Sequence, residues 1–150
     1  MAEDKEGNIW VGTWKNGLFV IDINKKKQIR HYNSSVATYS ITRDFKNNMW
    51  FCNGNNLHFF NSSNNAIRTF KIPGQITDIS ADVKRNKVWV SSSKKDTKIY
   101  AFNYKTDAIE SLETGVISDF SKKISLDKHN RIERIYGDAA RAYRLHGCVA

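Results

Sequence analysis

The sequence predicts an all-β fold, namely a β-propeller fragment of about three to four four-stranded antiparallel blades. Strand-like segments centred on Trp10, Trp50 and Trp89 recur at spacings of about 40 residues, within the range of roughly 40–50 residues that is typical of propeller blades. Each segment is apolar on both alternating faces, as expected of a strand that is covered on both sides. Clusters of Asn, Ser and Lys interrupt every apolar run before it reaches helical length, so we expect almost no helix.

Each repeat is expected to open with a short strand and a turn that begins at an aspartate. An aspartate can accept hydrogen bonds from the backbone amides of such a turn, and Gly7 supplies a positive φ in the first one. The turns begin at Asp4, Asp44, Asp82 and Asp127, and an isoleucine stands three residues before each of the later three, at Ile41, Ile79 and Ile124. Little chain precedes Asp4, so we expect that the first blade lacks most of its opening strand and that the sequence has lost its beginning.

A third and a fourth strand are expected after the Trp-containing strand. Third strands are predicted at residues 18–22, 57–61, 99–103 and 142–146, and fourth strands around the pairs Ile29 and Tyr32, Ile67 and Phe70, and Ile109 and Leu112. The blades should then cover residues 1–35, 36–73, 74–115 and 116–150, the first and last being incomplete. Closed propellers use about 4–8 blades, so we expect this chain to need missing blades or to self-associate. A β-sandwich or meander without radial stacking is the alternative, which the registered repeat disfavours.

The composition fits one globular domain, since the chain has 150 residues of which 40% are hydrophobic. The net charge of +9 comes mainly from short lysine clusters in predicted turns, which favours solvated turns over a nucleic-acid or acidic-polymer surface. No apolar run approaches the ~20 residues that span a bilayer, and residues 1–8 do not resemble a signal peptide. We therefore expect no nucleic-acid partner and no membrane insertion of this segment. Cys52 is interpreted as a small packing residue, while the redox state of Cys52 and Cys148 stays open.

Residues 3–13, EDKEGNIWVGT, and the following Gly17 and Leu18 closely resemble the repeat of the two-component regulator propeller family. The pattern of that family is E-D-x-x-G-x-I/L-W-x-G-T followed by G-L. The second repeat of this chain has Cys52 in place of the second glycine, and the third has Ser91 there. The fourth repeat has Glu133 where the tryptophan is expected and Ile135 where the small residue belongs.

The resemblance implies the periplasmic or other extracytoplasmic sensor region of a hybrid histidine kinase. Such sensors are often involved in sensing carbohydrate fragments and in two-component signal transduction. A structural or protein-interaction propeller is the alternative, which the sequence does not separate from a sensor.

The residues show no pattern typical of an enzyme, a metal site or a cofactor site. The four histidines, His31, His58, His129 and His146, lack metal-binding spacings, and His58 stands where other repeats have an aromatic residue, so packing is its favoured role. The recurring aspartates could be paired carboxylates or calcium ligands, but their position at turn starts favours capping. No nucleophile elbow or phosphate-binding glycine loop is found in the sequence. We therefore expect a non-catalytic chain without a cofactor.

Trp14 is the strongest candidate for ligand binding, because it stands at the loop end of its strand. Its indole, beside Lys15 and Asn16, could stack on a sugar ring, and packing on a neighbouring blade is the alternative. Loops between second and third strands gather at one rim of a propeller, so one surface should carry Trp14, Lys15, Asn16, Asn53, Asn55, Lys94 and Lys95. An oligosaccharide fits such a surface better than duplex DNA, because basic residues are sparse there and no helix is available to enter a groove.

Overall fold

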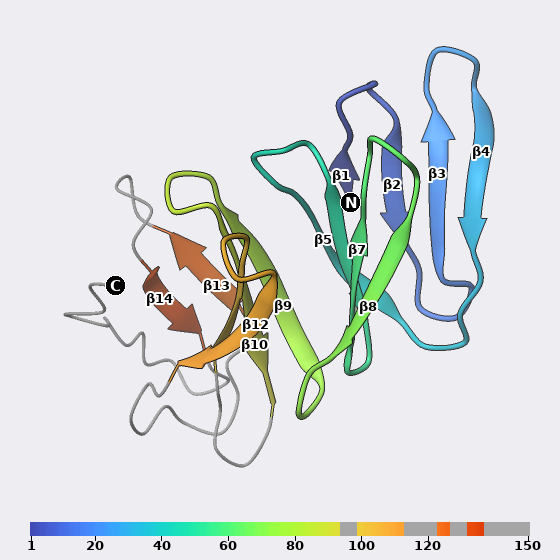
Figure 1. The fold of residues 1–150 in the computed structure, drawn as a ribbon. Coiled ribbons are helices and arrows are strands. Elements are labelled where there is room, and N and C mark those ends of the chain that lie inside the picture. Colours follow the sequence, from blue (N-terminus) through green and yellow to red (C-terminus); the bar gives the residue numbers. More distant parts are fainter. Residues whose placement is uncertain (94–98, 113–122, 127–131, 137–150) are drawn as a thin grey trace. The chain divides into compact units, whose positions relative to one another are not determined.

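The computed structural model describes residues 1–93, 99–112, 123–126 and 132–136, and these ranges contain strands and turns but no helix (Figure 1). Twelve of the strands form three four-stranded antiparallel sheets, and two more form a pair. The prediction of an all-β propeller fragment is confirmed. The chain divides into two compact units, residues 1–72 and residues 73–150, and each is described by itself.

The first unit contains two sheets with the same simple up-and-down order. The first sheet consists of β1 (Ala2–Glu3), β2 (Ile9–Gly12), β3 (Leu18–Asp22) and β4 (Lys27–Tyr32). The second consists of β5 (Thr38–Arg43), β6 (Met49–Asn53), β7 (Asn56–Phe60) and β8 (Ile67–Lys71). In both sheets the turns after the first and third strands lie at one end, and the turn after the second strand lies at the other end (Figure 1). Functional loops can therefore gather at either end of this unit.

The second unit contains one four-stranded sheet and one strand pair. The sheet consists of β9 (Ile76–Asp82), β10 (Lys87–Ser92), β11 (Ile99–Asn103) and β12 (Ala108–Leu112). The pair consists of β13 (Lys123–Leu126) and β14 (Ile132–Tyr136). The third strand that the sequence predicts at residues 142–146 lies outside the described residues, and so do Asp127, His129, His146 and Cys148. The blade boundaries predicted from the repeat stay a prediction.

The register of the fourth repeat corrects one sequence prediction. The residue opposite the tryptophan in the first three sheets is Ala2, Thr42 or Ser80. Ser125 follows an isoleucine in the same way as Thr42 and Ser80, and its partner is Arg134. The tryptophan position is therefore held by Arg134 and not by Glu133, and the small-residue position two further on is held by Tyr136 and not by Ile135. Arg134 is seven positions after Asp127, as Trp89 is seven after Asp82, whereas Trp50 is six after Asp44.

Trp10 lies at the centre of the core that joins the two sheets of the first unit. Its ring centroid is 5.1 Å from that of Phe60 and 6.2 Å from that of Phe51, and both of these residues belong to the second sheet. Gly12 lies so close to β5 that a β-carbon there would be 1.9 Å from the carbonyl oxygen of Thr38. The close approach of the two sheets explains why the residue two positions after this tryptophan is small.

A buried hydrogen bond between an aspartate and a tryptophan recurs in all three four-stranded sheets. The indole Nε1–H donates to the aspartate Oδ2, from Trp10 to Asp4 at 2.9 Å, from Trp50 to Asp44 at 2.9 Å and from Trp89 to Asp82 at 3.2 Å. The Oδ1 atom of Asp44 also accepts from the backbone amides of Lys46 and Asn48, at 2.8 and 2.9 Å. One carboxylate thus holds the turn and the tryptophan of the next strand together. Capping was predicted for these aspartates, but their bond to the indole was not.

Asp82 differs from the first two aspartates in the side chain that, besides the indole, donates a hydrogen bond to its carboxylate. The side-chain amides of Asn8 and Asn48 donate to the first two aspartates, at 3.0 and 3.2 Å. Asp82 instead accepts from the guanidinium of Arg85 at 2.9 Å, and the Arg85 amide donates to its Oδ1 at 3.1 Å. Because Asp82 is fully buried, the positive charge of Arg85 compensates the desolvation of its carboxylate.

Replacing Trp50 by alanine is expected to destabilise the chain by about 3–5 kcal/mol. The Trp50 side chain is fully buried, and its ring packs on those of Phe59 and Phe70, with centroids 4.8 and 6.2 Å away. Chemical denaturation measures the loss. Trp14→Ala is the matched control and should change the free energy of unfolding by less than about 0.5 kcal/mol, since its side chain is 83% exposed. A Trp50→Ala variant as stable as the parent would show that the buried tryptophans do not hold the sheets.

Candidate functional site

The loop between β2 and β3 displays Trp14 to solvent. Its neighbours Lys15 and Asn16 are also exposed. The base of the loop is closed by the Thr13 hydroxyl, which donates to the carbonyl of Gly17 at 2.9 Å and accepts from the amide of Asn16 at 3.0 Å. The indole is 83% exposed, so within the first unit Trp14 does not pack against a neighbouring blade.

The turn between β6 and β7 carries the next two candidate residues, and they differ in their surroundings. Asn55 is exposed, whereas Asn53 is half-buried. The Oδ1 atom of Asn53 is 3.1 Å from His58 Nε2 and accepts from Asn56 Nδ2 at 3.3 Å, while Asn53 Nδ2 donates to the Ser34 hydroxyl at 3.4 Å. The side chain of Asn53 therefore joins parts of the protein, and Asn55 is the member of this turn whose side chain faces solvent.

The segment 33–37 that joins the two sheets brings these two loops to one surface of the first unit. The amide of Thr38 donates to the carbonyl of Thr13 at 2.9 Å, which attaches the end of this segment to the Trp14 loop. At the other loop, a β-carbon on Gly54 would lie 3.4 Å from a methyl carbon of Val36. The structure thus brings Trp14, Lys15, Asn16, Asn53 and Asn55 to one end of the unit. Lys94 and Lys95, predicted for the same surface, lie outside the described residues.

His31 and His58 contact residues of this surface, although the sequence did not predict them as part of it. His31 stacks on Phe19 with ring centroids 4.2 Å apart, and its Nε2 lies 2.7 Å from the Asn16 carbonyl oxygen, to which it donates. His58 stacks on Phe51 at 4.8 Å, and its Nδ1 is 2.9 Å from the hydroxyl of Thr69. Burial lowers the pKa of His58, which favours the neutral ring near pH 7. The predicted packing role of His58 is confirmed, with the positioning of Asn53 added to it.

The aspartates Asp4, Asp44 and Asp82 have structural partners within their own sheets. In the described part of the chain no three His, Cys, Asp or Glu side chains come together in a way that could hold a metal ion. Asp4, Asp44 and Asp82 instead point into the sheets, towards their tryptophans. Burial raises the pKa of Asp4, but the hydrogen bonds from the Trp10 indole, from Asn8 and from the Glu6 amide outweigh it, and the net pKa is lowered. This carboxylate stays ionised at neutral pH and has structural partners.

Comparisons with known proteins agree with this architecture. Residues 1–15 match the family model of the two component regulator propeller, so the resemblance predicted from residues 3–13 is confirmed there. The structure is similar to the extracellular domain of a protein assigned as a hybrid two component system from B. thetaiotaomicron, with a TM-score of 0.68 and 23% sequence identity. The match covers 85% of this chain and 19% of that one, so this chain spans about a fifth of the length of that structure. At this identity the likeness shows the fold. A comparison with curated proteins gave no match.

The described ranges contain no helical segment with the length and hydropathy needed to cross a bilayer.

The lowered pKa of Asp4 predicts that acid destabilises the chain through this residue. The unfolded state binds the proton more tightly, so the contribution of Asp4 is fully present above its ordinary pKa of 3.8 and is lost as the pH falls through the lower folded pKa. Urea denaturation between pH 6 and pH 2.5 should show Asp4→Asn to be less stable than the parent at pH 6, with a difference that shrinks below about pH 4. Asp22→Asn is the comparison variant: the pKa of Asp22 is also lowered, chiefly by the hydrogen bond from the Lys25 amide, but no buried indole depends on this carboxylate, so the curve should change less. Parallel curves for the parent and Asp4→Asn would contradict the assignment.

Proposed function

We propose that this chain is a non-catalytic part of the extracytoplasmic sensor propeller of a two-component signalling protein. The observation that carries the proposal is the match of residues 1–15 to the two component regulator propeller. The similar structure from B. thetaiotaomicron is described as an extracellular domain of a hybrid two component system, which supports both the signalling role and the location. In such a protein the propeller would bind a signal molecule, and other parts of the protein would carry out phosphoryl transfer.

The proposed signal is an oligosaccharide that binds at the end of the first unit where Trp14 is displayed. An indole offers a flat apolar face that can lie on the apolar face of a sugar ring. The closed base of the Trp14 loop and the contact of His31 with Asn16 hold the loop in shape, so little ordering is needed when a ligand binds. The exposed Lys15, Asn16 and Asn55 side chains supply donors and acceptors for sugar hydroxyls. Lys94 and Lys95 remain part of the proposed surface through the sequence repeat.

A protein-interaction role is the second candidate, because apolar side chains are exposed at the same end. Val36 is 48% exposed and Tyr39 is 38% exposed, and both lie in or next to the segment that joins the two loops. Together with Trp14 they offer an apolar surface that a further blade, a second copy or another protein could cover. Sugar binding requires the polar neighbours of Trp14 as well, whereas a protein contact depends mainly on the three apolar residues.

Glycan binding by the complete sensor domain tests the proposed function. In a glycan screen at physiological salt, the parent should bind a defined oligosaccharide, and Trp14→Ala should lower the affinity for it at least about tenfold, as expected for an aromatic anchor. The matched control is Ile23→Ala, because Ile23 is 52% exposed and lies in the turn between β3 and β4, at the opposite end of the unit. This control should bind like the parent.

Three results would count against the proposal, each in a different way. Equal affinities of the parent and Trp14→Ala would remove Trp14 from the site. If the parent binds no glycan but binds a protein partner, and Trp14→Ala loses that binding, the protein-interaction role is favoured. Strong, salt-sensitive binding to nucleic acid with no glycan binding would overturn the sensor assignment.

A further inference from the structure

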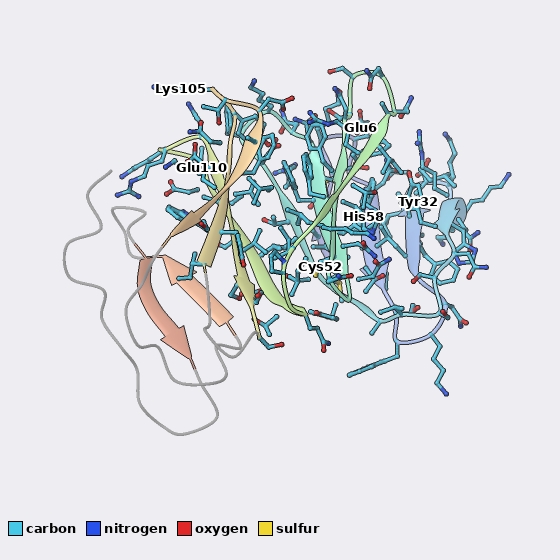
Figure 2. All side chains as sticks on the ribbon, turned by 60° about the horizontal axis from the view of Figure 1, so that its bottom comes forward. Glu6, Tyr32, Cys52, His58, Lys105 and Glu110 are labelled. Carbon is cyan, nitrogen blue, oxygen red and sulfur yellow. The ribbon has the colours of Figure 1, made fainter. Side chains whose placement is uncertain are left out.

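A cleft lies between the two sheets of the first unit, at the end opposite Trp14. It encloses about 220 Å³ and is bordered by the β1–β2 turn, the start of β4 and the β7–β8 turn. Figure 2 shows Glu6 towards the end of the unit at which the β7–β8 hairpin turns. The floor consists of the core side chains Trp10, Val20, Met49 and Phe60, and all four are buried. The cleft therefore combines an apolar floor with a polar mouth, as small-molecule sites usually do.

Arg30 supplies a positive charge at this mouth, and no ion pair joins it to a carboxylate of the described residues. Its guanidinium lies over the Phe60 ring, 5.1 Å from the centroid. One of its nitrogens, Nη2, donates to the Oδ1 atom of Asn65 at 2.7 Å. These two contacts use one of the five N–H groups of the guanidinium. The stacking and the bond to Asn65 hold the group in place, and its other N–H groups have no hydrogen-bond partner among the described residues.

The two acidic residues of the cleft are engaged by the protein itself. Both oxygens of Asp4 accept two hydrogen bonds each, from the Glu6 amide, the Asn8 amide and side chain, and the Trp10 indole. The carboxylate of Glu6 is 3.5 Å from the ammonium of Lys5. Neither carboxylate is therefore an open acceptor in the way that Arg30 is an open donor.

Ser62 is a second polar residue in the lining of the cleft. The hydroxyl oxygen of Ser62 is buried, and it has no hydrogen-bond partner. The backbone around it is well held, because the Ser62 amide donates to Oδ1 of Asn48 at 3.1 Å. A buried hydroxyl without a partner is uncommon in proteins and is normally satisfied by a ligand or a water molecule. Ser62 and Arg30 both line the cleft.

We propose that this cleft binds a small organic carboxylate with a compact apolar body. The carboxylate would pair with the Arg30 guanidinium, whose planar set of N–H groups matches it, and would accept a hydrogen bond from Ser62. The apolar body would lie on the floor formed by Phe60 and its neighbours. An inorganic anion would leave that floor unused, and a neutral amide would leave Arg30 without a counter-charge. The site is separate from the proposed oligosaccharide surface and does not depend on it.

Isothermal titration of the full chain with phenylacetate tests the proposal. Phenylacetamide, which has the same shape without the charge, and inorganic phosphate, which has charge without an apolar body, are the comparison ligands. Phenylacetate should bind at least about tenfold more tightly than either, and Arg30→Gln should weaken it by a similar factor. Ser62→Ala should weaken it less, and Val83→Ala should leave it unchanged, because Val83 is 57% exposed and does not line the cleft.

Arg30→Lys is the second variant, because it keeps the charge and most of the stem and so guards against a loss of folding in Arg30→Gln. It should retain more affinity for phenylacetate than Arg30→Gln does. No binding of phenylacetate at millimolar concentration would overturn the proposal. Equal binding of phenylacetamide, or unchanged affinity in a folded Arg30→Gln variant, would do the same. A glycan that binds through Trp14 while phenylacetate does not bind would leave the proposed function intact and remove only this site.

Discussion

The hydrogen bond from a tryptophan indole to a buried aspartate is the constraint on which each four-stranded sheet depends. The aspartate ends the first strand, accepts amide hydrogens of the turn and receives the indole of the second strand. Three needs are met by one carboxylate, namely closing the turn, satisfying a buried indole N–H and fixing the first strand against the second. Because the two residues are only six or seven positions apart, the contact is local and costs little chain entropy to form. A strand pair built in this way can recur along a chain with few other restrictions.

The two ends of the first unit differ, because the turns held by an aspartate lie at only one of them. The turns that begin at Asp4 and Asp44 lie at one end, and their amides are directed to those carboxylates. The loops at the other end have no such buried anchor, so they are free to differ, and there Trp14 is presented to solvent. Conserving one end for stability while varying the other for binding is how many scaffolds carry function on loops. The cleft lined by Arg30 does not follow this division between stable turns and variable loops, because it forms where two sheets meet.

The repeat was enough to predict the strands, since alternating apolar residues and aspartate turns recur with little change in length. Side-chain networks could not be predicted, because they join residues distant in sequence. Asn53 meets Ser34, which is 19 positions away in the sequence, and Arg30 reaches Asn65, which is 35 positions away. The position of Arg134 depends on turn length, because the spacing from aspartate to tryptophan is six positions in two repeats and seven in the third, and one extra residue moves every later side chain to the other face of the strand. Trp14 could be singled out from the sequence because it departs from the repeat, and the structure shows its side chain exposed.

Hydrogen exchange of the four indole Nε1–H groups, followed by NMR, tests the central role of the aspartate–tryptophan bond most directly. The indole protons of Trp10, Trp50 and Trp89 should exchange slowly, as buried and hydrogen-bonded groups do, while that of Trp14 should exchange at the rate of an exposed indole. In Asp44→Ala, the exchange of the Trp50 indole should accelerate far more than that of Trp10. If the Trp50 indole of the parent exchanges as fast as that of Trp14, or is unaffected by Asp44→Ala, the aspartate–tryptophan bond does not organise the sheets.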